Sequence, residues 1–381
     1  GKVEYRVAGS GSWAVVETGR QEQGTIHSAG LERLKKGTQY QYRISVNSRR
    51  GGEAVGQIME FRTTTMFSGP ATYYVAPDGN DAADGRSQAT AWRTIRKANY
   101  NVKPGDTVLV SPGRYTHAIA PRLSGQPDRR ITYRRNGDGE TFIDGGRYQA
   151  PLVFLRGKSH VTVDGFIFTG MPSEHEGTIR VIDSDEVRIL NCRVGYGRER
   201  DTFFSIRAMN CRNLLVEGNV LHGAASQLHV AGTPGLVVRN NTFAMPQPNR
   251  GAGGVNCVQV FYQTETARFT NNIFYGVGPR ATPQVAVYPG EYKGKLLFDY
   301  NLFFSGGKKK IIEIYGEHGK MLTPGATLQE WQANSGQDAH SIHADPLFVD
   351  VKEGDFRLQA GSPAVGAGEK GVTIGALGTV K

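Results

Sequence analysis

Short apolar strands that alternate with polar residues recur along most of the chain, and asparagine interrupts several of them. Six such stretches align as VTVDGFIF (161 to 168), VRILNCRV (187 to 194), LLVEGNVL (214 to 221), LVVRNNTF (236 to 243), ARFTNNIF (267 to 274) and LLFDYNLF (296 to 303). A shared position falls at Gly165, Asn191, Gly218, Asn240, Asn271 and Tyr300, at intervals of 26, 27, 22, 31 and 29 residues. A strand repeat of this length predicts a β-solenoid in which each copy forms one stacked coil.

The asparagines are predicted to form a sharp corner in each coil. The position after the shared one reads Phe166, Cys192, Asn219, Asn241, Asn272 and Asn301. Four successive asparagines can hydrogen-bond from coil to coil, and Gly or Asn just before them tolerates the left-handed backbone of a tight turn. The role expected for these asparagines is therefore structural.

This repeat resembles the right-handed parallel β-helix of the pectate lyase superfamily, where such a turn joins the second and third strands of each coil. The segment 73 to 115, which contains YYVAPDGNDAADGRSQATAWRTIRKAN and VKPGDTVLVSPGRY, is similar to the opening of many secreted β-helix proteins. The stretch ADPLFVDVKEGDFRLQAGSPAVGAG (344 to 368) is similar to their closing segment. The fold class expected is all-β, with a β-helix over 73–381. Trp92, Ile95 and Ala98 have helical spacing and predict an N-terminal cap helix. The resemblance implies a secreted or cell-surface protein.

Residues 1–66 predict a separate small β-sandwich, followed by a linker over 67–72. The stretch LKKGTQYQYRISV (34 to 46) resembles the late strands of a fibronectin type III domain, although Lys36 stands where that family usually has proline. The module is either a shortened sandwich or one whose first strands are missing. The resemblance implies a spacer or docking module and not a catalytic one.

Composition agrees with this organisation and narrows the partner. Of 381 residues, 38% are hydrophobic and 50 are glycine, as in a chain of many short strands and turns. The formal charge of +10 favours a polyanion, and acidic polysaccharide is preferred to nucleic acid because no reading motif accompanies the charge. We expect a monomer.

Membrane-span, signal-peptide and cysteine patterns in the sequence give no further indication of function. No segment approaches the roughly 18 apolar residues that a membrane span requires, so no membrane partner is expected. The first residues show no signal-peptide pattern, which predicts a mature or cytosolic chain. Cys192, Cys211 and Cys257 have neither a disulfide framework nor zinc-ligand spacing and are interpreted as buried small apolar residues.

A second family of strands follows a variable loop in each coil and is predicted to carry the site. In GTIRVID (177 to 183), FSIRAMN (204 to 210), QLHVAG (227 to 232) and VQVFYQ (258 to 263), alternation places the aliphatic residues inside. The residues between them then face outward, and one such residue from each successive coil forms a column on the outer face. This column contains Phe154, Arg180, Arg207, His229, Gln259, Ala286 and Glu313. In the superfamily that this chain resembles, the groove beside this sheet usually binds sugar.

Three residues of this column suit polysaccharide lyase chemistry. Arg180 and Arg207, on neighbouring coils, would neutralise a uronate carboxylate, and His229 would remove the adjacent proton. Tyr262 or Tyr288 would act as the general acid or replace the base. The substrate-binding residues expected beside this catalytic set are Gln259, Tyr262, Tyr288, Arg198, Arg200 and Glu313.

Two other functions stay open. A glycoside hydrolase needs two carboxyl groups, but the column supplies only Glu313, so loop acids such as Glu199 with Asp201, or Glu174 with Glu176, would have to contribute. A non-catalytic glycan-binding or adhesion protein could use the same surface. No cofactor or metal is expected: calcium serves some related lyases, but the nearest acidic pair, Asp183 and Asp185, is interpreted as a turn.

Overall fold

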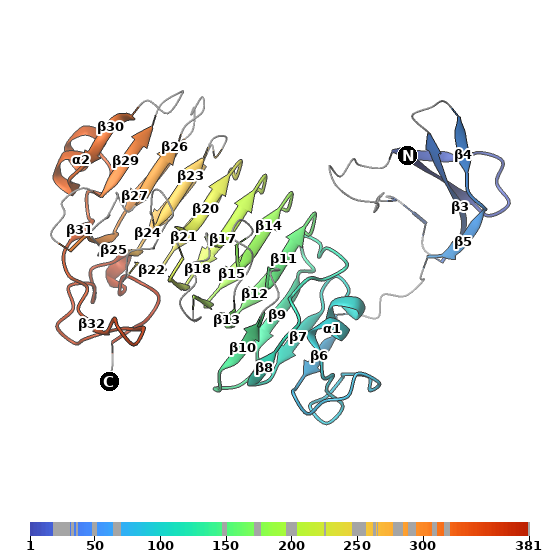
Figure 1. Cartoon of the computed structure of the whole chain (residues 1–381), viewed down its shortest axis with the longest axis horizontal. Coiled ribbons are helices and arrows are strands. Elements are labelled where there is room, and N and C mark those ends of the chain that lie inside the picture. Colours follow the sequence, from blue (N-terminus) through green and yellow to red (C-terminus); the bar gives the residue numbers. More distant parts are fainter. Residues whose placement is uncertain are drawn as a thin grey trace. The chain divides into compact units, whose positions relative to one another are not determined.

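The computed structural model divides into two compact units, Gly1–Gly69 and Pro70–Lys381 (Figure 1). It describes residues 1–17, 31, 34–35, 37–47, 52–63, 70–146, 151–170, 177–195, 204–224, 226–245, 257–261, 264, 266–276, 285–288, 295–306, 311–315 and 321–379. The boundary between the units falls among residues 67–72, where the sequence predicts a linker. Among the described helices, none is long and apolar enough to cross a membrane.

The first unit is a small antiparallel sheet. Its strands are β1 (Lys2–Val7), β2 (Ala14–Glu17), β3 (Gln39–Asn47), β4 (Glu53–Val55) and β5 (Met59–Arg62). They pair in the order β2-β1-β3-β4, with β5 also on β3. The guanidinium groups of Arg6 and Arg43 both lie over the Trp13 ring, at 4.3 and 4.6 Å from its centroid. The described residues of this unit form one sheet, and the likeness to fibronectin type III stays a prediction.

The second unit is a parallel β-helix with three long sheets. The first sheet contains β6 (Thr72–Val75), β7 (Thr107–Val110), β9 (Ile131–Arg135), β12 (Val161–Asp164), β15 (Arg188–Leu190), β18 (Leu215–Glu217), β21 (Leu236–Arg239), β24 (Thr266–Thr270) and β27 (Lys295–Asp299). The second contains β8 (Gly113–Tyr115), β10 (Thr141–Asp144), β13 (Ile167–Thr169), β16 (Arg193–Val194), β19 (Val220–His222), β22 (Thr242–Met245), β25 (Ile273–Gly276), β28 (Leu302–Phe304) and β31 (Ile342–His343). The third contains β11 (Val153–Arg156), β14 (Ile179–Ile182), β17 (Phe204–Met209), β20 (Ser226–Ala231), β23 (Val258–Phe261), β26 (Val285–Tyr288), β29 (Ile312–Tyr315) and β30 (Met321–Ala326).

Each coil passes from the first sheet through the asparagine corner to the second, and then through a loop to the third. The shared corner position has positive φ in all six predicted repeats: Gly165, Asn191, Gly218, Asn240, Asn271 and Tyr300. The predicted corner is therefore confirmed, including at Tyr300, where a ring adopts the left-handed backbone that asparagine or glycine adopts elsewhere. Inward side chains of the three sheets form one continuous apolar core.

The four corner asparagines form a buried hydrogen-bonded ladder, as predicted. The Asn241 side-chain oxygen accepts the backbone N–H of Asn219 at 2.9 Å and its side-chain amide at 3.0 Å. The Asn241 side-chain amide in turn donates to Val216 O at 2.9 Å and to the Asn272 side-chain oxygen at 3.0 Å. Cys192 occupies the equivalent place one coil earlier, where its thiol lies 3.1 Å from Leu190 O. All three cysteines are free and buried, in agreement with the interpretation from spacing.

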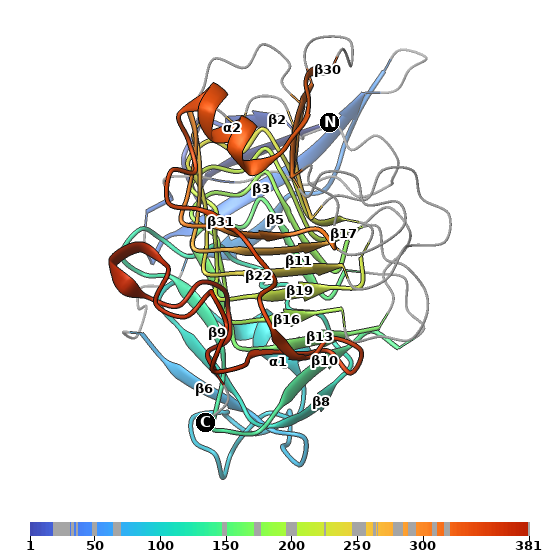
Figure 2. The same cartoon turned by 90° about the vertical axis from the view of Figure 1, so that its left-hand side faces the viewer.

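Both ends of the apolar core are covered. At the N-terminal end, α1 (Ile95–Asn101) begins after its N-cap Thr94 and buries Ile95 and Ala98. The predicted cap helix is thus present but starts later than the spacing indicated, because Trp92 pairs with Val75 in an isolated bridge instead of entering the helix. At the C-terminal end, which faces the viewer in Figure 2, α2 (Leu328–Ser335) and the antiparallel strand β30 follow the last coil.

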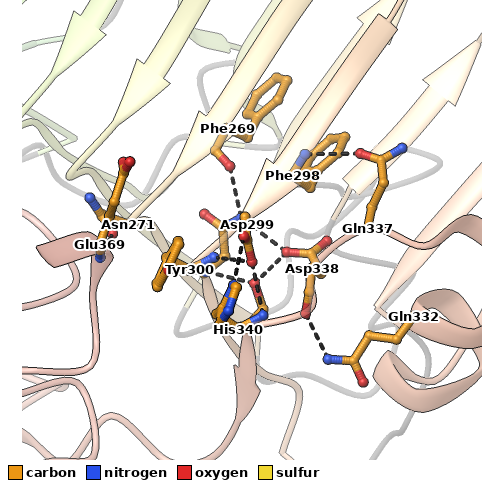
Figure 3. Close-up of polar contacts among 12 residues, drawn as sticks. Phe269, Asn271, Phe298, Asp299, Tyr300, Gln332, Gln337, Asp338, His340 and Glu369 are labelled. Carbon is orange, nitrogen blue, oxygen red and sulfur yellow. Dashed lines mark hydrogen bonds and ion pairs between the residues drawn. The ribbon is translucent and has the colours of Figure 1, made fainter.

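The asparagine ladder ends on a polar cluster beside α2 (Figure 3). Asp338 is 1% exposed, and its carboxylate accepts the Asn301 side-chain amide at 3.2 Å and the Trp331 indole N–H at 2.9 Å. Burial raises the pKa of Asp338 above its usual value. Next to it, His340 stacks on Tyr300 with centroids 4.5 Å apart and contacts Asp299 through Nδ1 at 2.9 Å. The last asparagine of the ladder is therefore hydrogen-bonded to the capping segment and not to a further coil.

The closing segment returns over the outer face of the second sheet. It contains β32 (Phe348–Asp350), β33 (Asp355–Leu358) and the short 3-10 segment η2 (Glu369–Gly371). A second apolar cluster joins this segment to the sheet through Val220, Ala244, Ile273, Leu302, Phe348, Phe356, Leu358, Ala364 and Ile374. The closing segment thus covers the outer face of the second sheet along β19, β22, β25 and β28, whereas the third sheet carries the candidate site.

Candidate functional site

Three adjacent strands of the third sheet place Arg180, Arg207 and His229 in one row. Arg180 on β14 pairs in register with Arg207 on β17, and Arg207 pairs with His229 on β20. Adjacent strands lie about 4.8 Å apart, so the three side chains leave the sheet as close neighbours. The strand register agrees with the predicted column, while the catalytic roles of its residues stay predictions.

The two arginines concentrate positive charge on a partly dehydrated surface. Both side chains are half-buried. Burial lowers the pKa of Arg207, and burial together with the neighbouring Arg207 and Arg156 lowers the pKa of Arg180. Two like charges on adjacent strands repel each other. An anion that bridges them would offset both the repulsion and the lost hydration.

The His229 imidazole lies between two aromatic rings. Its centroid is 4.5 Å from that of Phe204 and 4.7 Å from that of Phe261. Its Nδ1 atom lies 3.3 Å from the side-chain oxygen of Gln259, which pairs with His229 in register from β23. Burial lowers the pKa of His229 to about 4; the Gln259 contact raises it and the Arg207 charge lowers it further. The ring is therefore neutral at pH 7 and keeps one nitrogen lone pair.

Aromatic rings also lie beside the two arginines. The Arg180 guanidinium is 5.8 Å from the centroid of Phe154, and the Arg207 guanidinium is 5.5 Å from that of Phe204. Alternation along β17 would place Phe204 on the inner side with Ile206, so its contacts with Arg207 and His229 could not be predicted from the pattern. Phe204 is the site residue that sequence reasoning missed.

The far end of the column differs from the expectation. Ala286 pairs between Gln259 and Glu313, as predicted, but is 0% exposed, so it is not part of an open outer surface. Glu313 is half-buried and lies three strands from His229, which is about 14 Å at the usual strand spacing. The structure therefore groups Gln259 with the arginine and histidine row and leaves Glu313 apart from it.

Several predicted residues lie outside the described part of the chain. These are Arg198, Arg200 and Tyr262, the loop acids Glu174, Glu176, Glu199 and Asp201, and the side chain of Tyr288. The backbone of Tyr288 pairs with Phe261 in register. The binding roles of these residues stay predictions.

No metal-ligand cluster occurs among the described residues, where no three His, Cys, Asp or Glu side chains come together. The acidic pair considered for calcium occupies a turn after β14, as its sequence indicated. Asp185 forms an ion pair with Arg212 at 2.6 Å, and Asp183 accepts the Asn210 side-chain amide at 3.2 Å. Both carboxylates thus have protein partners.

Two half-buried histidines, His222 and His229, make stability depend on pH. Burial lowers the pKa of His222 and His229 to about 4, whereas an unfolded histidine has its usual value near 6.5. Between these values the unfolded chain binds more protons, so stability falls as the pH drops from about 6.5 to 4. We expect a loss of at most about 2 kcal/mol per imidazole between pH 8 and 5, measured by urea unfolding. The double variant His222→Asn, His229→Asn should flatten this dependence, and an unchanged slope would contradict the assignment.

Comparison with known proteins agrees with the fold. Residues 151–322 match the family described as the right handed beta helix region, a span that includes the whole arginine and histidine row. The predicted right-handed parallel β-helix is confirmed. A curated relative, alpha-1,3-galactosidase A of Akkermansia muciniphila, is 30% identical over 112 residues, which are 28% of this chain. The chain spans about 15% of that relative's length.

Three solved structures are similar to parts of this chain. The lacto-N-biosidase of Eubacterium ramulus is 12% identical with a TM-score of 0.39, covering 72% of this chain and 67% of that one. A rhamnogalacturonan lyase is 12% identical with a TM-score of 0.37, covering 74% and 91%. The family 28 exopolygalacturonase of Yersinia enterocolitica is 14% identical with a TM-score of 0.35, covering 77% and 74%.

Proposed function

We propose that this protein is a polysaccharide lyase that cleaves a uronic acid-containing polysaccharide on the outer face of the third sheet. The observation that carries the proposal is the row of two half-buried arginines beside a neutral histidine. The net charge of +10 supports an acidic polymer as substrate. We place the protein outside the cell on the resemblance described above, and we expect it to be a monomer.

In the proposed reaction, the substrate carboxylate binds between Arg180 and Arg207. Their charges stabilise the negative charge that develops on the carboxylate when the neighbouring carbon loses its proton. His229 takes that proton, and the electron pair of the broken C–H bond forms a carbon–carbon double bond. The bond to the glycosidic oxygen at the next carbon breaks, and that oxygen receives a proton from a phenol, for which Tyr262 and Tyr288 are the candidates.

A glycoside hydrolase is the second candidate, because the curated relative is named a galactosidase. That chemistry requires two carboxyl groups about 5 to 9.5 Å apart. Glu313 is the one carboxylate of the described column, so a hydrolase would need a partner from the loops, such as Glu199 or Asp201. The described site therefore favours the lyase.

The two reactions leave different products. A lyase acting on a panel of acidic polysaccharides produces both new reducing ends and an unsaturated sugar that absorbs in the ultraviolet, whereas a hydrolase produces reducing ends alone. We expect both signals to rise together, and to be absent with the His229→Ala variant. Reducing ends without ultraviolet absorbance would replace the lyase by the hydrolase. Binding without either product would indicate a glycan-binding protein.

A further inference from the structure

We propose that Gln259 is a positioning residue that holds the His229 imidazole with its proton on Nδ1 and its lone pair on Nε2. This inference rests on the proposed function, since it concerns the base of that reaction. Sequence reasoning assigned Gln259 to substrate binding, whereas the structure places its side chain against the histidine.

The first argument is the chemistry of the contact. The atom of Gln259 that faces Nδ1 is the amide oxygen, at 3.3 Å. An amide oxygen only accepts hydrogen bonds, so Nδ1 must be the donor, and in a neutral imidazole the other nitrogen is then the acceptor. This leaves Nε2 as the atom of His229 that can take a proton from substrate.

The second argument is that the ring cannot turn freely. Phe204 and Phe261 flank it with centroids 4.5 and 4.7 Å away, so a large rotation of the imidazole would collide with one of them. Gln259 and Phe261 both lie on β23, two residues apart, and approach His229 from the same strand. Strand β23 thus supplies both the Gln259 hydrogen bond that selects the tautomer and the Phe261 ring that limits rotation of the imidazole.

The third argument concerns charge. Arg207 is the charged group that approaches His229 from β17, while the residues facing it from β23 are the neutral Gln259 and Phe261. Among the described residues of the column, the one carboxylate is Glu313, three strands away. A carboxylate in place of the Gln259 amide would favour the imidazolium form. A neutral amide selects the tautomer without protonating the base.

The same arrangement couples substrate binding to basicity. The Arg207 charge is one of the causes that lower the pKa of His229. An anion bound to Arg207 offsets part of that charge, so the histidine becomes a stronger base when the carboxylate arrives. By linkage, the anion then binds more tightly as the pH falls toward the pKa of His229.

The tautomer can be read directly in the intact protein. With nitrogen-15-labelled histidine, and His229 assigned by its loss in the His229→Asn variant, we expect a protonated Nδ1 and an unprotonated Nε2 at pH 7. A protonated Nε2 would overturn the proposal. This measurement needs no substrate, so it decides the tautomer even if the protein proves not to be a lyase.

The Gln259→Glu variant tests the link to catalysis. We expect the His229 titration to move upward by at least one pH unit, a tenfold change in its proton affinity, and the acid limb of kcat/KM to move with it. Gln88→Glu, a matched change at an exposed loop residue of the same unit, should move neither. A shifted titration with an unmoved acid limb would overturn the positioning role. Absence of turnover by the unaltered protein on every acidic polymer would instead remove the proposed function.

Discussion

Replacement of Arg207 by alanine is expected to lower kcat/KM on the acidic substrate by about a thousandfold or more. Loss of one preorganised donor to a developing anion costs about 10² to 10³ in rate, and Arg207 also contributes a full charge at the centre of the row. It stands between Arg180 and His229 in register, so its loss removes the charge that adjoins both residues in the row. Activity is measured as initial rates of ultraviolet absorbance on the polymer that the panel identifies.

Two control variants separate this effect from damage to the fold. Arg207→Lys keeps the charge but loses the planar pair of donors, so it should retain part of the activity. Arg239→Ala removes an exposed arginine of the first sheet that pairs with Glu217 at 2.9 Å, and should leave turnover unchanged. Unchanged turnover in Arg207→Ala would remove the proposed site.

Replacement of Asn241 by alanine is expected to lower the free energy of unfolding by about 2 to 4 kcal/mol. Asn241 is 0% exposed, and its side chain bonds to backbone groups of its own coil and of the preceding coil, and to the Asn272 side-chain oxygen of the next coil. Alanine leaves buried partners without hydrogen bonds, at about 1 to 3 kcal/mol for each group. Equilibrium unfolding in urea measures this loss. A substitution of the adjacent residue, Asn240, gives the matched control.

Asn240 precedes Asn241 and has φ of 54°, but it is only half-buried and is not a member of the ladder. Asn240→Gly keeps the left-handed backbone accessible, so it should change stability by less than about 1 kcal/mol. Equal losses in the two variants would mean that the corner depends on backbone conformation and not on the buried ladder.

The corners could be predicted from sequence because two independent signals coincide there. The left-handed position selects Gly or Asn, and the buried position after it selects Asn, so residues such as Asn240 and Asn241 mark the same point in successive coils. These corners mark where each coil begins again, and alternation within the strand that follows the next loop then predicts Arg180, Arg207 and His229 in one row.

Alternation was less informative where a strand begins or where a side chain is small. It could not show that Phe204, at the first residue of β17, contacts Arg207 and His229. Nor could it show that Ala286 is buried although it belongs to the outer column. The loops before the third sheet vary in length from coil to coil, and no period links residues such as Arg198 or Tyr262 to the row. Their part in the site therefore rests on experiment.

The ladder of corner asparagines also bears on how such a protein could change its length. Asn219, Asn241 and Asn272 each donate and accept the same hydrogen bonds. Each of their coils therefore supplies the hydrogen-bond partners that the coil before it and the coil after it require. The ends are different, because Cys192 opens the series and Asp338 closes it. Duplication of a middle coil would thus be accommodated without new chemistry, and would extend the outer row by one position. A gene that gains or loses internal copies could in this way lengthen or shorten its binding surface while both ends stay as they are.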